Sequence, residues 1–169
     1  MTQSASESNE HQYCIEPLAS LDSDGLLSLN NAHAVELSWL TEQEFKGLLA
    51  ISYHSVGIAP AGALLVAIDQ AASYDNRNFQ WFRARFSDFI YVDRVVVSQC
   101  LRGKGVARAL YEDLFRRANV DRKSVITCEV NLDPPNQASL SFHRRLGFQA
   151  VGESVLPSGK RVEYELKEL

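Results

Sequence analysis

Cysteine is scarce in this sequence, and its spacing is unfavourable for metal binding. The three cysteines, Cys14, Cys100 and Cys128, lie far apart in a chain of 169 residues. None belongs to a CxxC or CxxH pair, which argues against a zinc site and against a disulfide framework. We therefore expect no metal, and reduced thiols of the kind found in cytoplasmic proteins.

A basic excess and long apolar runs are absent as well. Lysine and arginine number 17 against 21 aspartates and glutamates, a formal net charge of −4, which argues against a general nucleic-acid partner. No apolar run approaches the ~18 residues of a membrane span. Residues 1–12 lack the basic start and apolar stretch of a secretory signal. We expect a disordered N-terminal tail at 1–12, one domain at 13–169, no membrane partner and a cytoplasmic location.

What is present is an alternation of strand and helix patterns. Apolar residues make up 46% of the chain, enough for a substantial core. Strands are predicted at 26–29, 52–59, 63–69, 89–97, 125–132, 148–156 and 161–166. Helices are predicted at 30–37, 42–51, 106–119 and 136–147, and 70–87 is expected to be a loop that can include a helical turn. This alternation indicates an α/β (α+β) domain with a mixed sheet.

A glycine-rich turn joins the strongest predicted strand to an amphipathic helix. Its centre reads Arg102-Gly103-Lys104-Gly105. Glycines let a backbone approach an anion closely, and a helix start presents unpaired N–H groups with a partial positive charge. The turn therefore predicts a phosphate cradle. It matches neither the P-loop nor the dinucleotide-binding glycine pattern. A tight turn with solvated basic residues is the alternative interpretation.

Two ordered motifs resemble those of a known family. The first resembles the acyl-CoA signature Arg/Gln-x-x-Gly-x-Gly/Ala of the GNAT superfamily of N-acetyltransferases, and reads Val95-Val96-Val97 and then Arg102-Gly103-Lys104-Gly105-Val106-Ala107. The second, at 136–148, is similar to the family's second conserved helix with its terminal Gly147-Phe148. The resemblance implies a single-domain GNAT-like fold, a mixed and mostly antiparallel central sheet of about six or seven strands flanked by helices. It also implies a splay between the strands at 89–97 and 125–132.

The resemblance implies acetyl-CoA as co-substrate, with no metal required. In the family, one strand pairs with the pantetheine arm as an added strand would, and the turn amides hold the pyrophosphate. An amide N–H near Val97 would polarise the thioester carbonyl in the gap between the splayed strands. The residues implied for cofactor binding are Val95, Val96, Val97, Leu101, Arg102, Gly103, Lys104, Gly105, Val106, Ala107, Asn136 and Ser139.

Acetyl transfer also needs an acid that protonates the leaving thiolate. Where many family members carry a tyrosine on the second helix, this sequence has His143. The substitution is a departure from the family pattern, but an imidazole can donate a proton near neutral pH. A histidine on the helix surface without a catalytic duty is the alternative.

The base that deprotonates the amine is expected on one of the two splayed strands. Glu129 and Asp93 are the candidate carboxylates, and Glu129 is favoured. Strand alternation predicts that Asp93 shares a face with Val95 and Val97 and lies opposite Arg94. For either carboxylate, the alternative is a structural salt bridge, for example to Arg94.

The acceptor pocket is expected to draw on aromatic and amide side chains before the central strand. Asn131 joins them because alternation places it on the same face as Glu129. The predicted substrate-binding residues are Tyr74, Asn78, Trp81, Phe82 and Asn131. Packing of a long loop onto the sheet is the alternative for the aromatic residues.

The resemblance implies transfer of an acetyl (acyl) group from acetyl-CoA to a primary amine of a small molecule, by direct attack in a ternary complex. Two alternatives stay open: acetylation of a protein or peptide amine, and a non-catalytic acyl-CoA-binding regulatory module. A nucleotide-binding domain is a more distant alternative. The sequence leaves the acceptor, the acyl chain and the oligomeric state open, a homodimer included.

Overall fold

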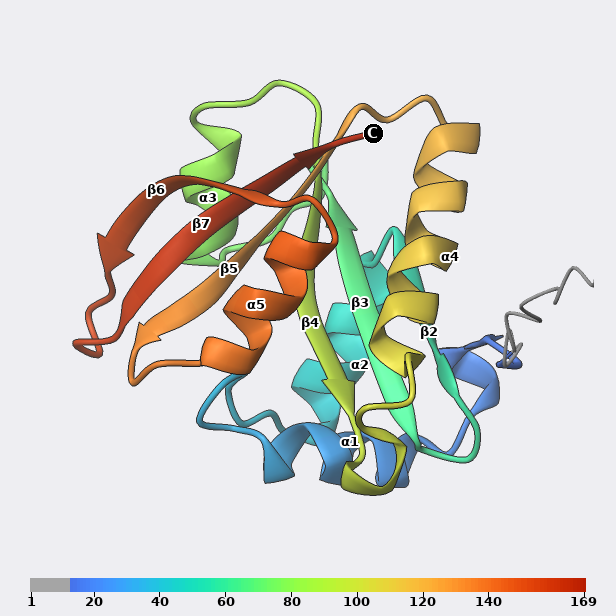
Figure 1. Cartoon of the computed structure of the whole chain (residues 1–169). Coiled ribbons are helices and arrows are strands. Elements are labelled where there is room, and N and C mark those ends of the chain that lie inside the picture. The colour runs from blue at the N-terminus through green and yellow to red at the C-terminus, as the bar shows by residue number, and fades with distance from the viewer. Residues whose placement is uncertain (1–12) are drawn as a thin grey trace, which may run out of the picture.

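The computed structural model describes residues 13–169, so the expected tail at 1–12 lies outside the described residues. One seven-stranded sheet runs through the domain in the order β1-β2-β3-β4-β5-β7-β6 (Figure 1). All neighbouring strands are antiparallel except β4 and β5, which are parallel. The strands are β1 (Glu16–Pro17), β2 (His54–Ile58), β3 (Ala63–Asp69), β4 (Ile90–Val97), β5 (Val125–Asp133), β6 (Gln149–Val155) and β7 (Arg161–Glu168). The predicted fold class is confirmed.

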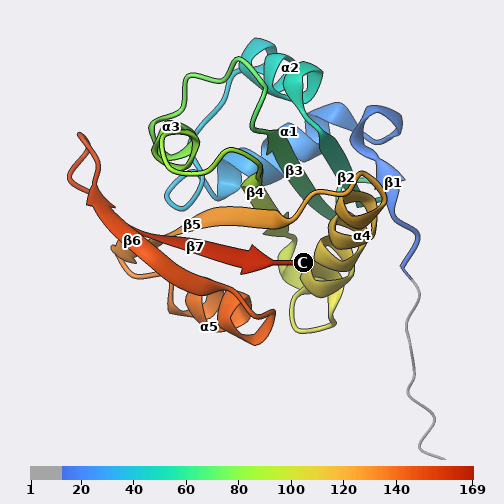
Figure 2. The same cartoon turned by 90° about the horizontal axis from the view of Figure 1, so that it is seen from above.

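Helices cover both faces of the sheet (Figure 2). One core cluster joins the sheet to α4 (Val106–Val120) and α5 (Gln137–Arg145). A second cluster, on the opposite face, joins it to α1 (Ser23–Ala32), α2 (Glu42–Ile51) and α3 (Arg77–Arg83). Two short 3₁₀ turns, Leu18–Ser20 and Gln99–Leu101, complete the regular structure of residues 13–169. None of the described helices is long and apolar enough to cross a membrane.

The predicted splay between the two central strands is confirmed. β4 and β5 pair only at Ile90↔Ile126 and Tyr91↔Thr127. β5 instead continues its pairing with β7 as far as Asp133. The sheet therefore opens between the carboxyl-terminal halves of β4 and β5, and the N-terminal ends of α4 and α5 lie beside this opening (Figure 1).

Local sequence signals explain the helices that flank the site. Thr41 and Glu44 form a capping box at the start of α2. The Asn136 side chain accepts a hydrogen bond from the Ser139 amide and begins α5. Gly147 adopts φ 92° just after α5, the left-handed position for which glycine is suited.

Three local predictions were wrong. Residues 26–29 belong to α1, because Asp22 caps a helix at the Gly25 amide and Leu26 is buried as its core residue. That helix ends at Ala32, so only residues 30–32 of the predicted helix at 30–37 are helical, and residues 33–37 form turns and a bend. Residues 70–87, expected to be a loop, contain α3, which Asn76 caps and which buries Phe79 and Phe82 one turn apart. The segment holds so many aromatic residues that the three-residue spacing of its two buried phenylalanines does not stand out in the sequence.

A bulge in the sheet overturns the predicted alternation along β4. Val92 and Arg94 pair with consecutive residues of β3, so Asp93 is an extra residue between them. Val95 and Val97 therefore pack with Val92 toward α4. Asp93 instead bonds to Arg94, which reaches across to α1. The expectation that Asp93 shares a face with Val95 and Val97 is wrong, because one inserted residue resets the two-residue period.

Candidate active site

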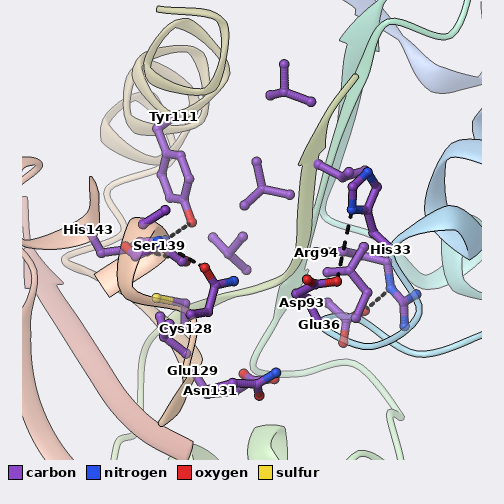
Figure 3. Close-up of a pocket in the computed structure, with 18 of the residues that line it drawn as sticks. His33, Glu36, Asp93, Arg94, Tyr111, Cys128, Glu129, Asn131, Ser139 and His143 are labelled. Carbon is purple, nitrogen blue, oxygen red and sulfur yellow. Dashed lines mark hydrogen bonds and ion pairs between the residues drawn. The ribbon is translucent and has the colours of Figure 1, made fainter. Parts of the chain in front are cut away.

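A cleft of about 300 Å³ lies in the opening between β4 and β5 (Figure 3). β4 and β5 form its walls, and α4, α5 and residues 33–37 close it. It brings together most of the residues predicted for catalysis and for the acyl end of the cofactor. The predicted residues that line it are Asp93, Val95, Val96, Val97, Arg102, Glu129, Asn131, Asn136, Ser139 and His143.

The glycine turn has the backbone needed to hold a pyrophosphate. Gly103 and Gly105 have φ of 72° and 82°, and a Cβ built on either would meet nothing within 4 Å. Gly105 is the N-cap of α4 and provides no side-chain hydrogen bond to it. The first-turn amides of α4 are therefore left for an anion, in open space and at the positive end of the helix dipole. This geometry fits the diphosphate of coenzyme A.

The other residues predicted for the turn have different surroundings. The Val106 side chain is buried in the core, so only its amide faces the turn. Leu101 packs against the core cluster beside α4. Arg102 folds back onto β4, where its Nε donates to the Val97 carbonyl oxygen at 3.1 Å and its Nη2 lies 3.1 Å from His33 Nε2. Arg102 thus links the turn to the cleft wall.

Glu129 lies on the cleft floor among neutral hydrogen-bond donors. Its two oxygens accept from the Tyr91 hydroxyl at 2.6 Å and from the Asn78 amide at 2.9 Å. Among residues 13–169, no lysine, arginine or histidine forms an ion pair with this carboxylate. Loss of hydration raises the pKa of Glu129 to about 7, although both hydrogen bonds oppose the shift.

Asp93, the other predicted base, is part of a buried network of hydrogen bonds and an ion pair. Its carboxylate accepts from Arg94 Nε at 2.7 Å and from the Tyr74 hydroxyl at 2.6 Å. Arg94 continues the network to Asn30 on α1 and to Ser38. The structural salt bridge to Arg94, the alternative interpretation for the carboxylates, is present for Asp93 and not for Glu129.

His143 is buried rather than exposed on the helix surface. Its Nε2 lies 2.7 Å from the Tyr111 hydroxyl, and its Nδ1 lies 2.9 Å from the Ser139 carbonyl oxygen. Burial lowers the pKa of His143 to about 4, so the ring is neutral near pH 7. Both ring nitrogens are engaged, and the cleft can exchange a proton with His143 through the Tyr111 hydroxyl.

The predicted acceptor residues on and before α3 lie behind the cleft wall. Tyr74 holds Asp93, and Asn78 holds Glu129. Trp81 stacks on Tyr164 at 4.1 Å between ring centroids, and Phe82 has no exposed surface. Of the five residues predicted to bind the acceptor, only Asn131 lines the cleft. The aromatic pair accords with the packing alternative.

Several cleft residues were not predicted from the sequence. Tyr111 is a buried residue of the amphipathic helix α4, and no local signal marks its hydroxyl as a partner of His143. Tyr91 and Glu165 do not line the cleft but contact Glu129 and His143, which do. Both come from strand positions that show only alternation. His33 and Glu36 line the cleft from the segment after α1, where a wrong helix was predicted. All become neighbours only through the tertiary fold.

Two cleft-lining residues, Cys128 and His143, form with Glu165 a cluster that can bind metals. Ligand atoms of Cys128, His143 and Glu165 lie within 4.8 Å of one another, and all three residues are buried. The spacing of Cys128 from the other two gave no hint of this in the sequence. The expectation that no metal is needed stays a prediction.

Comparison with known proteins identifies the family. The family model described as "Acetyltransferase (GNAT) family" matches residues 28–148. This span holds the splayed strands, the glycine turn and the whole of α5. The chain belongs to the GNAT acetyltransferase family.

Individual relatives are more distant. An "L-methionine sulfoximine/L-methionine sulfone acetyltransferase" of Pseudomonas aeruginosa is 35% identical over 97 residues, 53% of this chain and 52% of that protein. The chain thus matches about half the length of this curated relative. Two solved structures share the fold. A NatC complex bound to Gag peptide and CoA has a TM-score of 0.69 and 14% identity, over 92% of this chain and 98% of that one. The ribosomal-protein-S18-alanine N-acetyltransferase of Escherichia coli has a TM-score of 0.63 and 13% identity, over 92% of each chain.

Proposed function

We propose that this protein transfers an acetyl group from acetyl-CoA to a primary amine of a small molecule, by direct attack in a ternary complex. The observation that carries the proposal is Glu129. It is a carboxylate on the cleft floor whose partners are neutral. An acceptor ammonium supplies the missing positive charge, and a carboxylate with a pKa of about 7 can take a proton from it near neutral pH.

The cofactor would lie along the route from the glycine turn to the cleft. The first-turn amides of α4 and Gly103 to Gly105 would hold the diphosphate. From Val95 to Val97, β4 is paired with β3 but not with β5. Its free edge there would pair with the pantetheine arm, with Asn136 and Ser139 on the opposite side of the cleft. When bound, the cofactor supplies the thioester carbonyl that the amine attacks. The proposal needs no metal and no nucleic acid, and a cytoplasmic location and a homodimer stay predictions.

Two observations favour a small acceptor. The cleft volume of about 300 Å³ is at the lower end of the range of small-molecule sites. The Pseudomonas aeruginosa relative is named for acetylating an amino-acid analogue. For these reasons we propose amino acids and their analogues as the first acceptors to test.

Acetylation of a peptide N-terminus is the second candidate. Val35 and Trp39 are each 63% exposed and flank the cleft-lining residues 36 and 37. An apolar rim of this kind could hold an extended peptide. The structural neighbour NatC is described with a bound peptide, although a likeness at this identity concerns the fold alone.

A screen of amines with acetyl-CoA tests the proposal. Acetylated products are detected by mass spectrometry, and thiol release is measured in parallel. L-methionine sulfoximine, free amino acids, polyamines and short peptides with free N-termini form the panel. We expect a small amine to be acetylated with stoichiometric thiol release. Turnover of peptides alone would favour the second candidate, and tight acetyl-CoA binding without any turnover would favour a non-catalytic module.

A further inference from the structure

Tyr111 and His143 form a buried pair that the proposed mechanism has not used. The Tyr111 hydroxyl, from α4, lies 2.7 Å from His143 Nε2 on α5, and both residues line the cleft. His143 Nδ1 lies 2.9 Å from the Ser139 carbonyl oxygen. Nδ1 also lies 3.2 Å from the Ser139 hydroxyl, which can accept as well as donate. Because a carbonyl oxygen can only accept, we assign the ring proton to Nδ1, and Nε2 then accepts from Tyr111. Figure 3 shows the Tyr111 hydroxyl directed at His143. The Tyr111 side chain is among the cleft-lining residues, although it has no surface exposed to solvent.

A buried carboxylate lies on the other side of the same histidine. Glu165, on β7, has no exposed surface. Within residues 13–169, neither of its oxygens has a hydrogen-bond partner. Its Oε2 lies 4.0 Å from His143 Nδ1. An ionised carboxylate in the core is costly, and burial raises the pKa of Glu165 to about 7. In its ionised form it would stabilise a positive charge that forms transiently on the adjacent imidazole.

An ammonium acceptor has two protons to lose before it becomes an amide. The first leaves to Glu129 under the proposed function. The second leaves the nitrogen as the N–C bond forms, at the same time as the C–S bond breaks and the sulfur gains an electron pair. A group that takes this proton and returns it to the sulfur balances the reaction without any further acid or base.

We propose that Tyr111 is this group and that it works through His143. The Tyr111 oxygen accepts the proton from the attacking nitrogen while its own hydroxyl proton passes to His143 Nε2. As the C–S bond breaks, the proton returns from Nε2 to the tyrosine oxygen, and the other proton moves from that oxygen to the sulfur. In this relay the Tyr111 oxygen would contact the reacting atoms, whereas His143 and Glu165 are positioning residues. The inference rests on the proposed acetyl transfer.

The Tyr111→Phe variant tests the relay through kcat. We expect kcat to fall ~100-fold or more, the lower range for general acid–base assistance. The KM values for acetyl-CoA and the amine should change little, since the phenyl ring keeps the packing of Tyr111 against Phe142 and Phe148. Glu165→Gln keeps the volume of the side chain and removes its charge, and it should lower kcat to a smaller extent with unchanged KM values.

Tyr53→Phe is the matched control. Tyr53 also donates a hydroxyl proton, to Asp121 Oδ2 at 2.6 Å just beyond the far end of α4, and lies outside the cleft lining. This variant should keep the wild-type kcat. The melting temperature of each variant shows whether it is folded. If the wild type transfers acetyl and folded Tyr111→Phe keeps kcat within about twofold of it, the relay is overturned while the proposed function stands.

The histidine tautomer gives a readout that does not depend on activity. Long-range ¹H–¹⁵N spectra of the labelled wild-type protein should show His143 protonated at Nδ1 alone and neutral at pH 7. An Nε2–H tautomer would overturn the relay, whatever the activity. So would one equivalent of zinc in the purified protein that is lost in Cys128→Ser, because His143 Nδ1 would then be a metal ligand and not a hydrogen-bond donor.

Discussion

The two carboxylates that line the cleft, Asp93 and Glu129, differ in their partners. Asp93 is paired with Arg94, and both side chains are almost completely buried, at 2% and 5% exposed. Glu129 is half-buried and meets only the Tyr91 hydroxyl and the Asn78 amide. A paired carboxylate mainly organises the fold, whereas a carboxylate with neutral partners is free to bind and deprotonate an ammonium.

Glu129 gives a prediction about pH. Its pKa is raised to about 7, so kcat/KM should rise as the pH passes through 7 and the carboxylate ionises. Glu129→Gln should lower kcat/KM by ~100-fold or more and flatten that rise. A pH–rate profile of both proteins from about pH 5 to 9 makes the comparison. A Gln variant with the wild-type profile would assign the base elsewhere.

The same shift has a consequence for stability. The unfolded chain ionises this group near its ordinary pKa of 4.5, below its folded value of about 7. The folded state therefore loses stability relative to the unfolded state as the pH rises between these values. Glu129→Gln should be more stable than the wild type at about pH 8 and not at pH 4, as measured by denaturant unfolding.

For Asp93 we predict the opposite effect on stability: neutralising it should destabilise the fold. Asp93→Asn leaves the buried Arg94 charge without its counterion, so the free energy of unfolding should fall by about 3 kcal/mol. Glu153→Gln removes one partner of the Arg161 pair, in which both side chains are more than half exposed, and should cost less than ~1 kcal/mol. Urea unfolding measures both. Equal, small losses would mean that the Asp93–Arg94 pair does not support the fold.

At the scale of elements, function depends on where β4 and β5 separate and on how α4 begins. The strands separate after two residue pairs and leave the rest of β4 facing a cleft. The glycine turn then begins α4 without a side-chain cap and leaves its first amides free. Two regular elements thus provide a strand edge and an anion site that no isolated side chain could supply.

Gly105→Asp tests the anion site. The new carboxylate would lie beside the diphosphate, and Gly105 has φ 82°, a left-handed angle that strains any other residue. We expect weaker acetyl-CoA binding by calorimetry. Gly159→Asp is the matched control, because Gly159 has φ 86° and equally open surroundings, in the connection between β6 and β7. Both variants should lose similar stability, and only Gly105→Asp should lose affinity. Similar affinities would place the cofactor elsewhere.

At the scale of the whole molecule, the cofactor site exists only when the sheet, turn and both flanking helices are assembled. Acetyl-CoA should therefore stabilise the folded chain by ~2.7 kcal/mol at a hundred times its Kd. For a chain of this size, that corresponds to a rise in Tm of about 5–10 °C. Differential scanning fluorimetry with acetyl-CoA, ATP and NAD measures it. Equal stabilisation by NAD, with none by acetyl-CoA, would contradict the proposed cofactor.

The features that the sequence determined by itself are local. The capping box at Thr41, the Asn136 cap and the turn from Arg102 to Gly105 depend on residues a few positions apart, so their patterns survive without the fold. Together with the order of the two motifs, they were sufficient for the fold class and the family. Short-range hydrogen bonding and backbone angles decide such features.

The tertiary structure decided which polar groups meet. Tyr111 and His143 are 32 positions apart, and only the packing of α4 beside α5 brings their hydrogen-bonding atoms to 2.7 Å. The bulge that turns Asp93 toward Arg94 depends on the register between β4 and β3. The two-residue alternation of the β4 sequence does not contain this register and could not predict the bulge. Burial then sets the proton affinities, lowering the pKa of His143 and raising that of Glu129. The loss of water around each group exists only in the folded chain.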